Sequence, residues 1–140
     1  RTGCPKHIRF FELSFKIIGI IFRVYNELGY GYQEKYYQKA VALDFDKENL
    51  KYTKEVEVKL EYRNEKIGKY FIDFIVENKI VLELKVGSRF RQRDIKQILS
   101  YLKTTSLKLG ILIFNIACVK LFYHLVNKPS KVGFGYVFIY

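Results

Sequence analysis

Two carboxylates and one amine stand near the middle of this 140-residue chain, at spacings that could bring them together. Asp73 precedes Glu83 by ten residues, and Lys85 follows Glu83 by two. Two carboxylates on one surface can hold a divalent cation, and a neighbouring ammonium can stabilise a negatively charged reacting group. The pattern therefore predicts a metal site with a catalytic lysine beside it.

A hairpin would place these groups. Residues 67–76 and 80–86 are rich in β-branched, aromatic and apolar residues, which predicts two strands joined by a turn at 77–79. With that turn centred on its middle residue, Val76 pairs with Ile80 and the two carboxylates lie directly opposite each other. Opposed residues have Cβ atoms about 4.5–5.5 Å apart, which lets both reach one ion.

A purely structural explanation is also open, because glutamate and lysine two apart are common on half-exposed strands, and Asp73 could form a salt bridge with Lys85. The other face of residues 80–86 is apolar, so we expect a buried side and a side that bears Glu83 and Lys85. Aspartate is disfavoured in strands, and Asp73 interrupts two apolar runs. Its charge there needs a partner or a metal.

Composition favours a polyanionic partner. The chain has 25 Lys plus Arg against 14 Asp plus Glu, a net charge of +11, and 49% hydrophobic residues, enough for the core of a single domain over residues 1–140. Nucleic acid, with DNA favoured, is the commonest partner of a small basic domain, and a membrane surface is the competitor. No apolar run is long enough to span a bilayer, so we expect no membrane insertion.

Cysteine and histidine carry no metal-binding pattern. Cys4 and Cys118 are far apart, which disfavours a disulfide scaffold, a zinc site or an iron–sulfur cluster and favours a reducing, cytoplasmic setting. His7 and His124 lack any ligand spacing, so we assign them no role.

Periodicity predicts an α/β fold. Apolar residues recur at helical spacing over 12–28, and Gly29 stands where a helix should end. The elements expected after it are a helix at 33–43, strands at 56–62, 67–76 and 80–86, a helix at 92–103, and strands at 109–114, 119–125 and 136–140. A helix between the third and fourth strands implies a crossover and therefore a mixed sheet.

The helix at 92–103 and the segment before it carry further candidates. Gln97 and Tyr101 lie four residues apart on the flank of its apolar stripe, although a solvent-exposed glutamine and a partly buried tyrosine are ordinary there. A run of cations follows Lys85 and could contact phosphates, although such a run is often only a solvated face. Its members are Arg89, Arg91, Arg93 and Lys96.

Three segments together resemble a known family. Gly31, Glu34 and Tyr37 match the GxxExxY signature of a group within the PD-(D/E)XK nuclease superfamily, and Asp73 with Glu83-Leu84-Lys85 resembles the core of that superfamily. The segment Gln97 to Tyr101 resembles the QxxxY element of its RecB-like and lambda-exonuclease-like branches. The resemblance runs over residues 17–115. Ile72 replaces the proline of the idealised motif, a position without a chemical role.

The resemblance implies a restriction-endonuclease-like core: a helix, three antiparallel strands, a helix and a further strand, with helices flanking a mixed sheet. It implies that Glu34, Asp73 and Glu83 bind Mg²⁺ or Mn²⁺, with the backbone carbonyl of Leu84 completing the set. Lys85, kept protonated by the carboxylates, would act electrostatically rather than as a neutral base.

The expected function is a metal-dependent nuclease, with Gln97 and Tyr101 in supporting roles at the phosphate. Two alternatives stay open. One is a catalytically silent nucleic-acid-binding module with the same fold. The other is an interaction protein for an acidic macromolecule, in which residues 134–140 provide an edge strand or a homodimer surface.

Overall fold

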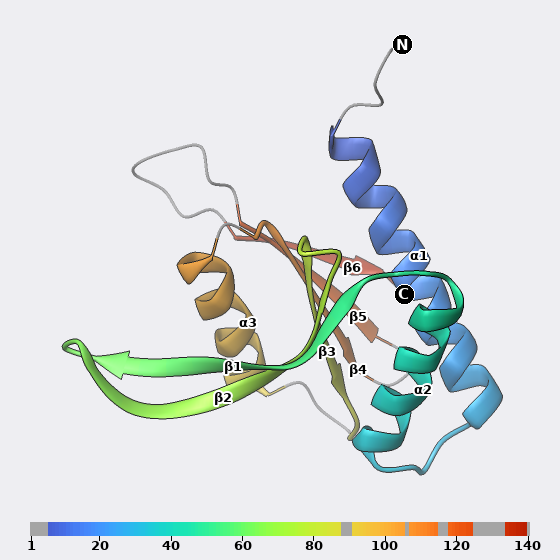
Figure 1. Cartoon of the computed structure of the whole chain (residues 1–140), viewed down its shortest axis with the longest axis horizontal. Coiled ribbons are helices and arrows are strands. Elements are labelled where there is room, and N and C mark those ends of the chain that lie inside the picture. Colours follow the sequence, from blue (N-terminus) through green and yellow to red (C-terminus); the bar gives the residue numbers. More distant parts are fainter. Residues whose placement is uncertain (1–5, 88–90, 106, 115–117, 125–133, 140) are drawn as a thin grey trace.

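The computed structural model describes residues 6–87, 91–105, 107–114, 118–124 and 134–139 (Figure 1), with side chains between residues 11 and 114 except 88–90, 104 and 106. The described elements are α1 (Lys6–Leu28), α2 (Glu34–Lys47), β1 (Tyr52–Tyr62), β2 (Glu65–Val76), β3 (Ile80–Lys85), α3 (Gln92–Thr104), β4 (Leu109–Phe114), β5 (Cys118–His124) and β6 (Phe134–Ile139). Arg89, Cys4 and Tyr140 lie outside the described residues.

The six strands form one sheet in the order of the chain, from β1 to β6. Strands β3 and β4 are parallel, and every other neighbouring pair is antiparallel. A parallel pair needs a crossover, and α3 supplies it. The predicted mixed α/β sheet, with the order helix, three antiparallel strands, helix and strand, is therefore confirmed.

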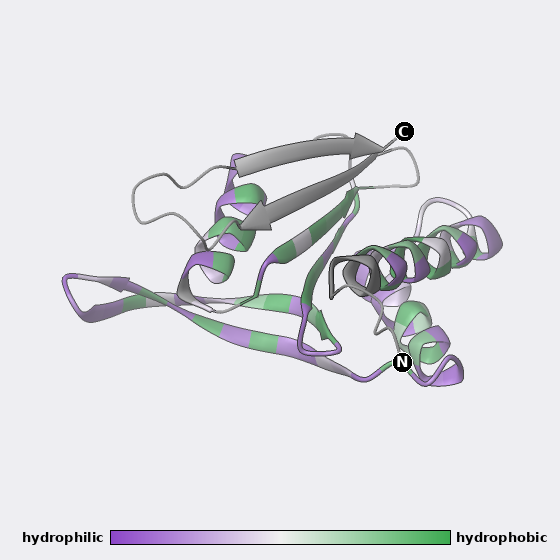
Figure 2. Ribbon diagram, turned by 90° about the horizontal axis from the view of Figure 1, so that it is seen from above, coloured by the Kyte–Doolittle hydropathy of each residue, from purple (hydrophilic) through white to green (hydrophobic). Residues whose placement is uncertain are grey.

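Helices cover both faces of the sheet. Helices α1 and α2 lie on one face and α3 lies on the other (Figure 1), and the hydrophobic colouring gathers on the central strands between them (Figure 2). The two faces have separate hydrophobic clusters. One packs Ile17, Ile21, Val41 and Phe45 against Phe74, Leu82 and Leu84, and the other packs Ile98 and Leu102 against Ile72, Val81 and Leu112.

Helix α1 follows the helical spacing of apolar residues predicted from the sequence. Ile17, Ile21 and Val24 recur every three or four residues and are buried, so they form one apolar stripe. The helix ends as predicted at Gly29, whose φ of 76° suits glycine and whose N–H donates to the Tyr25 carbonyl (2.8 Å). None of the helices in the described ranges is long and apolar enough to cross a membrane.

Strands β1 and β2 form a hairpin longer than expected, and its outer part projects from the sheet (Figure 1). We call residues 57–71 the hairpin arm. Its tip is a turn in which Arg63 and Asn64 have φ values of 49° and 64°. Beyond the reach of the helices, Leu60, Tyr62 and Phe71 remain about half exposed.

One expectation about β3 is wrong. The sequence predicted one buried face and one open face bearing Glu83 and Lys85, but Glu83 is only 2% exposed and Val81 on the same face is fully buried. The reason is that α3 packs on this face, with Ile98 and Leu102 in the cluster that contains Val81. A strand in the middle of a sheet covered on both sides loses the wet face that simple alternation suggests.

Candidate active site

Asp73 and Glu83 meet where the ladder between β2 and β3 ends. The predicted register is confirmed, with Val76 opposite Ile80. One step beyond the last ladder pair, each carboxylate accepts a backbone N–H of the other strand: the Asp73 N–H donates to Glu83 Oε1 (2.8 Å), and the Leu84 N–H donates to Asp73 Oδ2 (2.8 Å). Side-chain acceptors thus replace backbone acceptors, and the two carboxylates are held at one point.

Asp73 also lies where β2 changes faces. Residues two apart on a regular strand share a face, yet Ile72 packs on the α3 side and Phe74 on the side of α1 and α2, each with 0% exposure. The ladder to β1 skips this position, and Glu55, which would pair with Asp73, has a φ of 51°. The irregularity leaves the Asp73 carboxylate bonded to the β3 backbone and outside both hydrophobic clusters.

Lys85 joins carboxylates from three elements. Its Nζ lies 3.7 Å from Glu34 Oε1 at the start of α2, 3.6 Å from Glu83 Oε2 on β3, and 3.9 Å from Asp94 Oδ1 in the first turn of α3. The Glu83 and Asp94 side chains are 3% and 6% exposed, while that of Lys85 is 25% exposed. The lysine side chain is therefore partly open to solvent and is backed by two nearly buried carboxyl groups.

Packing around Tyr37 fixes Glu34 at the first position of α2. The Tyr37 ring stacks on Tyr25 with centroids 4.3 Å apart, and its hydroxyl donates to the Gly29 carbonyl (2.6 Å). Gly31 has a φ of 101°, a conformation that other residues rarely adopt. In the 31–37 segment, Gly31 thus turns the chain, Glu34 presents a carboxylate, and Tyr37 anchors the turn.

Burial and mutual repulsion set the protonation of the two strand carboxylates. Burial, and secondarily the nearby Asp73 carboxylate, raises the pKa of Glu83 to about 8. Burial raises the pKa of Asp73 to about 6, against the lowering effects of the Leu84 N–H and Lys85. Burial lowers the pKa of Lys85, but the Glu83, Glu34, Asp73 and Asp94 carboxylates outweigh it, so the net change is upward and the lysine stays charged.

The donor set suits a hard divalent cation. Oxygen ligands are those that Mg²⁺ and Mn²⁺ prefer, and burial, the main cause of the raised pKa values of Asp73 and Glu83, makes a positive partner favourable for their charged forms. The buried Tyr25 hydroxyl has no hydrogen-bond partner among the described residues, and its pKa is raised by burial and then by neighbours that include Glu34 and Asp73. A hydrated cation nearby would provide that partner.

The carboxylates are nevertheless not preassembled around a cation. Within the part of the chain that the structure describes, no three acidic, histidine or cysteine side chains form a ready-made metal site. The Lys85 ammonium lies among Glu34, Glu83 and Asp94 instead. Cation binding would therefore require these side chains to turn away from the lysine.

The residues in and before α3 that were predicted to contact phosphate lie in different surroundings. Gln97 lines a cavity with Arg93 and Lys96, and its backbone carbonyl accepts a hydrogen bond from the Tyr70 hydroxyl. Lys85 pairs with carboxylates such as Asp94 in the described structure. Tyr101 packs against the hydrophobic cluster under α3. Arg91, Arg93 and Lys96 are exposed. The predicted roles of these residues, and of the Leu84 carbonyl as a ligand, stay predictions.

Sequence reasoning missed Asp94 and Gln38. Asp94 precedes Ile98 by four residues and Leu102 by eight, so a carboxylate on the buried stripe of α3 was the available signal. Gln38 lies one turn after Glu34 on α2, donates to Glu34 Oε1 (3.4 Å), and hydrogen-bonds Asp73. An amide at that spacing carries no signal by itself.

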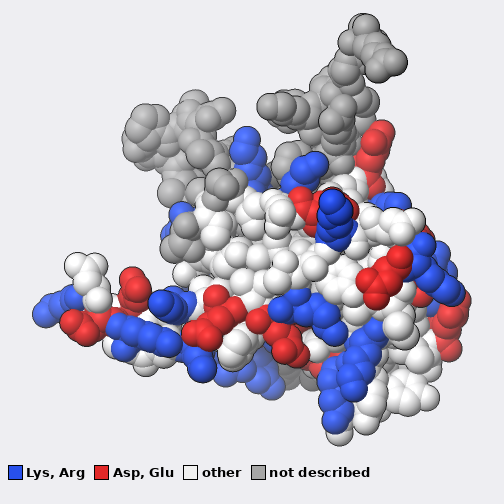
Figure 3. Space-filling model, in the orientation of Figure 1, with Lys and Arg blue, Asp and Glu red and all other residues white. Residues whose placement is uncertain are grey.

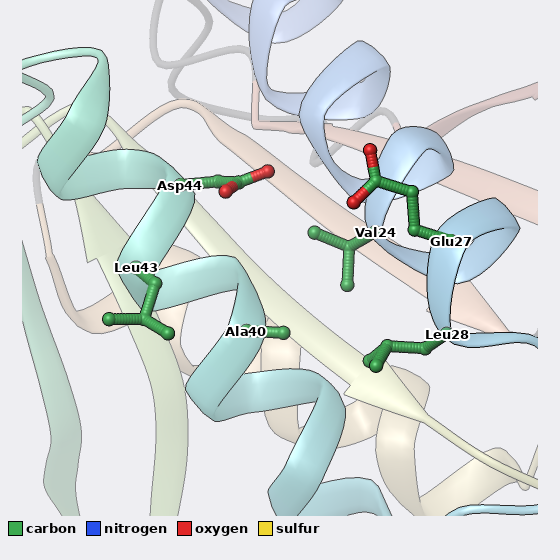
Figure 4. Close-up of a pocket in the computed structure, with 6 residues that line it drawn as sticks. All are labelled: Val24, Glu27, Leu28, Ala40, Leu43 and Asp44. Atoms are coloured by element: carbon green, nitrogen blue, oxygen red, sulfur yellow. The ribbon is translucent and has the colours of Figure 1, made fainter.

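A second cavity lies away from this cluster, between α1 and α2. Figure 4 shows the Glu27 and Asp44 carboxylates at its rim, above Val24, Leu28, Ala40 and Leu43, and its volume is about 280 Å³. Asp44 also accepts two hydrogen bonds from Arg23. Because its charged lining residues are acidic, this cavity is poorly suited to a polyanion.

Comparison with known proteins gives one match. A family model described as the PD-(D/E)XK nuclease superfamily matches residues 11–121, which is most of the chain and includes all the residues that surround Lys85. No curated protein matches the chain, and no solved structure matches it.

Removing the Tyr37 hydroxyl should loosen the presentation of Glu34. We expect Tyr37→Phe to lower the free energy of unfolding by about 0.5–1.5 kcal/mol, because the Gly29 carbonyl loses its donor while the stacked ring remains. Urea denaturation measures the change. Tyr36→Phe is the matched control, since Tyr36 is 46% exposed. An equal loss in both variants would contradict the assigned role.

The metal-free protein should become less stable as pH rises from about 5 to 8. The folded-state pKa values of Asp73 (about 6) and Glu83 (about 8) lie above their ordinary values, so the folded state holds protons that the unfolded chain has released. Each group reduces stability by up to about 1.4 kcal/mol per pH unit inside its window. Thermal melts in chelator should show this decline, and Glu83→Gln should flatten it. Glu57→Gln, an exposed position paired with Lys66, should leave the decline unchanged, and a melting temperature that rises over this range would disprove the assignment.

Proposed function

Because the chain belongs to the PD-(D/E)XK nuclease superfamily, we propose that it is a metal-dependent nuclease that hydrolyses phosphodiester bonds of nucleic acid, DNA first of all. The observation that carries the proposal is the meeting of Glu34 and Glu83 at Lys85, with Asp73 hydrogen-bonded across the strands to Glu83 and Leu84. We further propose that it belongs to the GxxExxY group and that residues 1–140 form one domain.

Glu34, Asp73 and Glu83, with the Leu84 carbonyl, would hold Mg²⁺ or Mn²⁺. When bound, such a cation supplies charge neutralisation at the phosphate and acidifies the water that attacks it. The chain's own contribution begins with carboxylates already placed at the end of the β2–β3 ladder. Gln38, bonded to Glu34 and Asp73, would keep two of them in position.

Lys85 is proposed as an electrostatic catalyst. Its pKa is raised overall, so it carries a full positive charge at neutral pH, and a quarter of its side chain is open to solvent. A phosphate oxygen that gains charge in the transition state would accept a hydrogen bond from this ammonium. Asp94, which is not among the proposed metal ligands, would orient the ammonium from behind without reaching the substrate.

The remaining cations would bind the polyanionic backbone. Arg93 and Lys96 on α3, and Arg91 just before it, are exposed, and the first turn of this helix reaches Lys85 through Asp94. Phosphate contacts of this kind give affinity without sequence specificity. We propose supporting phosphate contacts for Gln97 and Tyr101, and phosphate binding by Arg89, which lies outside the described residues. The cytoplasmic setting and the homodimer stay untested expectations.

Cleavage should depend on the carboxylates and on the lysine. In Mg²⁺ or Mn²⁺, we expect the native chain to cut DNA and Asp73→Asn, Glu83→Gln and Lys85→Ala each to lose about 100-fold or more in rate. Labelled single-stranded and double-stranded DNA and RNA, with a chelator as the blank, provide the measurement. Glu57→Gln is the surface control. Equal cleavage by all five proteins would remove the catalytic assignment. Retained DNA binding without cleavage by the native chain would favour the silent binding module.

Cation binding should be visible without activity. We expect Mn²⁺ to raise the melting temperature of the native chain, because the ion binds the folded carboxylates and the unfolded chain lacks them in one place. Asp73→Asn and Glu83→Gln should lose most of that rise, and Glu57→Gln should retain it. A rise of the same size in all four proteins would place the ion elsewhere.

A further inference from the structure

A different cavity, the one lined by Gln97, lies between the hairpin arm and α3. Its volume is about 420 Å³, within the range of small-molecule sites. The arm contributes Leu60 and Tyr70, and α3 contributes Arg93, Lys96, Gln97 and Ser100. The two walls therefore come from segments far apart in the sequence.

The wall formed by the hairpin arm is apolar and fixed. Leu60 is 46% exposed and presents apolar surface to the cavity. The Tyr70 hydroxyl donates to the Gln97 carbonyl (3.1 Å) and is also hydrogen-bonded by the Ser100 side chain. Bonded to α3 at its tip, the Tyr70 ring has a set orientation and offers a preformed surface for stacking.

The wall formed by α3 is cationic. Arg93 and Lys96 are three residues apart, so they share one side of the helix, and both are exposed. None of the described residues that line this cavity is acidic, in contrast to the cavity between α1 and α2 with Glu27 and Asp44. An apolar and aromatic pocket with a positive rim has the charge and shape to take a nucleotide: base inside, phosphate at the rim.

The cavity and the site at Lys85 share helix α3. Asp94, which lies 3.9 Å from the Lys85 ammonium, is flanked on α3 by cavity residues Arg93 and Gln97. One helical turn is about 5.4 Å, so a strand whose phosphate lies at Lys85 would bring a neighbouring nucleotide to this pocket.

The hairpin arm has mixed charge and is not a continuous cationic track for a duplex. Figure 3 shows positive and negative side chains interspersed along it. The charged residues in its outer part are Lys59, Glu61, Arg63, Glu65, Lys66 and Lys69. Four of these six residues are basic and two are acidic, so a duplex backbone, which is uniformly negative, would meet repulsion from Glu61 and Glu65 between the attractive contacts.

We propose that this cavity binds an unpaired base of the strand being cut, so that the nuclease acts on single-stranded nucleic acid or on frayed and overhanging ends. The inference depends on the proposed function only for the position of the phosphate at Lys85. A base stacked within a duplex cannot enter a side pocket unless it is extruded, which costs energy that an unpaired base avoids.

Binding measured in chelator tests the proposal without cleavage. The probes are a labelled DNA strand, its blunt duplex, and the same strand with one abasic residue placed at successive positions. We expect the native chain to bind the strand about tenfold more tightly than the duplex, and an abasic residue at one position to remove most of that advantage. Electrostatics alone would favour the duplex, since its charge density is higher.

Two variants test the pocket itself. Leu60→Ala removes part of the apolar wall and Ser100→Leu fills the space, so both should reduce single-strand affinity about five- to tenfold and leave duplex affinity unchanged. Leu43→Ala, at a leucine that is 67% exposed in the cavity between α1 and α2, is the matched control and should alter neither affinity.

Equal affinity of the native chain for strand and duplex, or indifference to abasic residues at every position, would overturn the inference even if neither variant folds. A full single-strand preference in correctly folded Ser100→Leu would also overturn it. These equilibrium results are independent of whether the carboxylate variants lose cleavage, so the inference and the proposed function can fail separately.

Discussion

The ion-pair cluster at Lys85 is the constraint that organises this molecule. One ammonium lies within 4 Å of carboxylates from α2, β3 and α3, which are otherwise held together by apolar packing on two separate faces of the sheet. Buried charge is costly, and well-packed apolar residues in the same place would be as stable or more so. A fold that concentrates its buried carboxylates around one lysine therefore sacrifices stability at that point, as functional sites commonly do.

The same compromise is visible in the backbone. A regular ladder through Asp73 would pair it with Glu55 on one side and continue the β2–β3 ladder on the other. The strand instead changes faces between Ile72 and Phe74, and the hydrogen bonds lost from the ladder are recovered by the Asp73 and Glu83 carboxylates. Local irregularity thus frees a carboxylate from the sheet without leaving its neighbouring N–H groups unsatisfied.

The features that could be predicted from sequence are those that depend on residues close together in the chain. The register of Val76 with Ile80 depends on a short turn and on local alternation, and the end of α1 depends on Gly29, so both were accessible. The burial of Glu83 was not, because it depends on α3, which packs on that strand from a later part of the chain. Asp94 was missed for the same reason: its importance comes from Lys85, with which it shares no periodic pattern.

Helix α3 connects the ion-pair cluster at Lys85 to the cavity that we propose binds a base. Its first turn brings Asp94 to Lys85, and the side that carries Arg93 and Lys96 faces the cavity closed by Tyr70. The Tyr70 hydroxyl donates a hydrogen bond to the Gln97 carbonyl, so the position of the hairpin arm is linked to that of α3. Any shift of α3 would move this cavity and the support of Lys85 together. Under the two proposals, a strand seated in the cavity would also stabilise the arrangement of the lysine, which would couple binding of the base to cleavage.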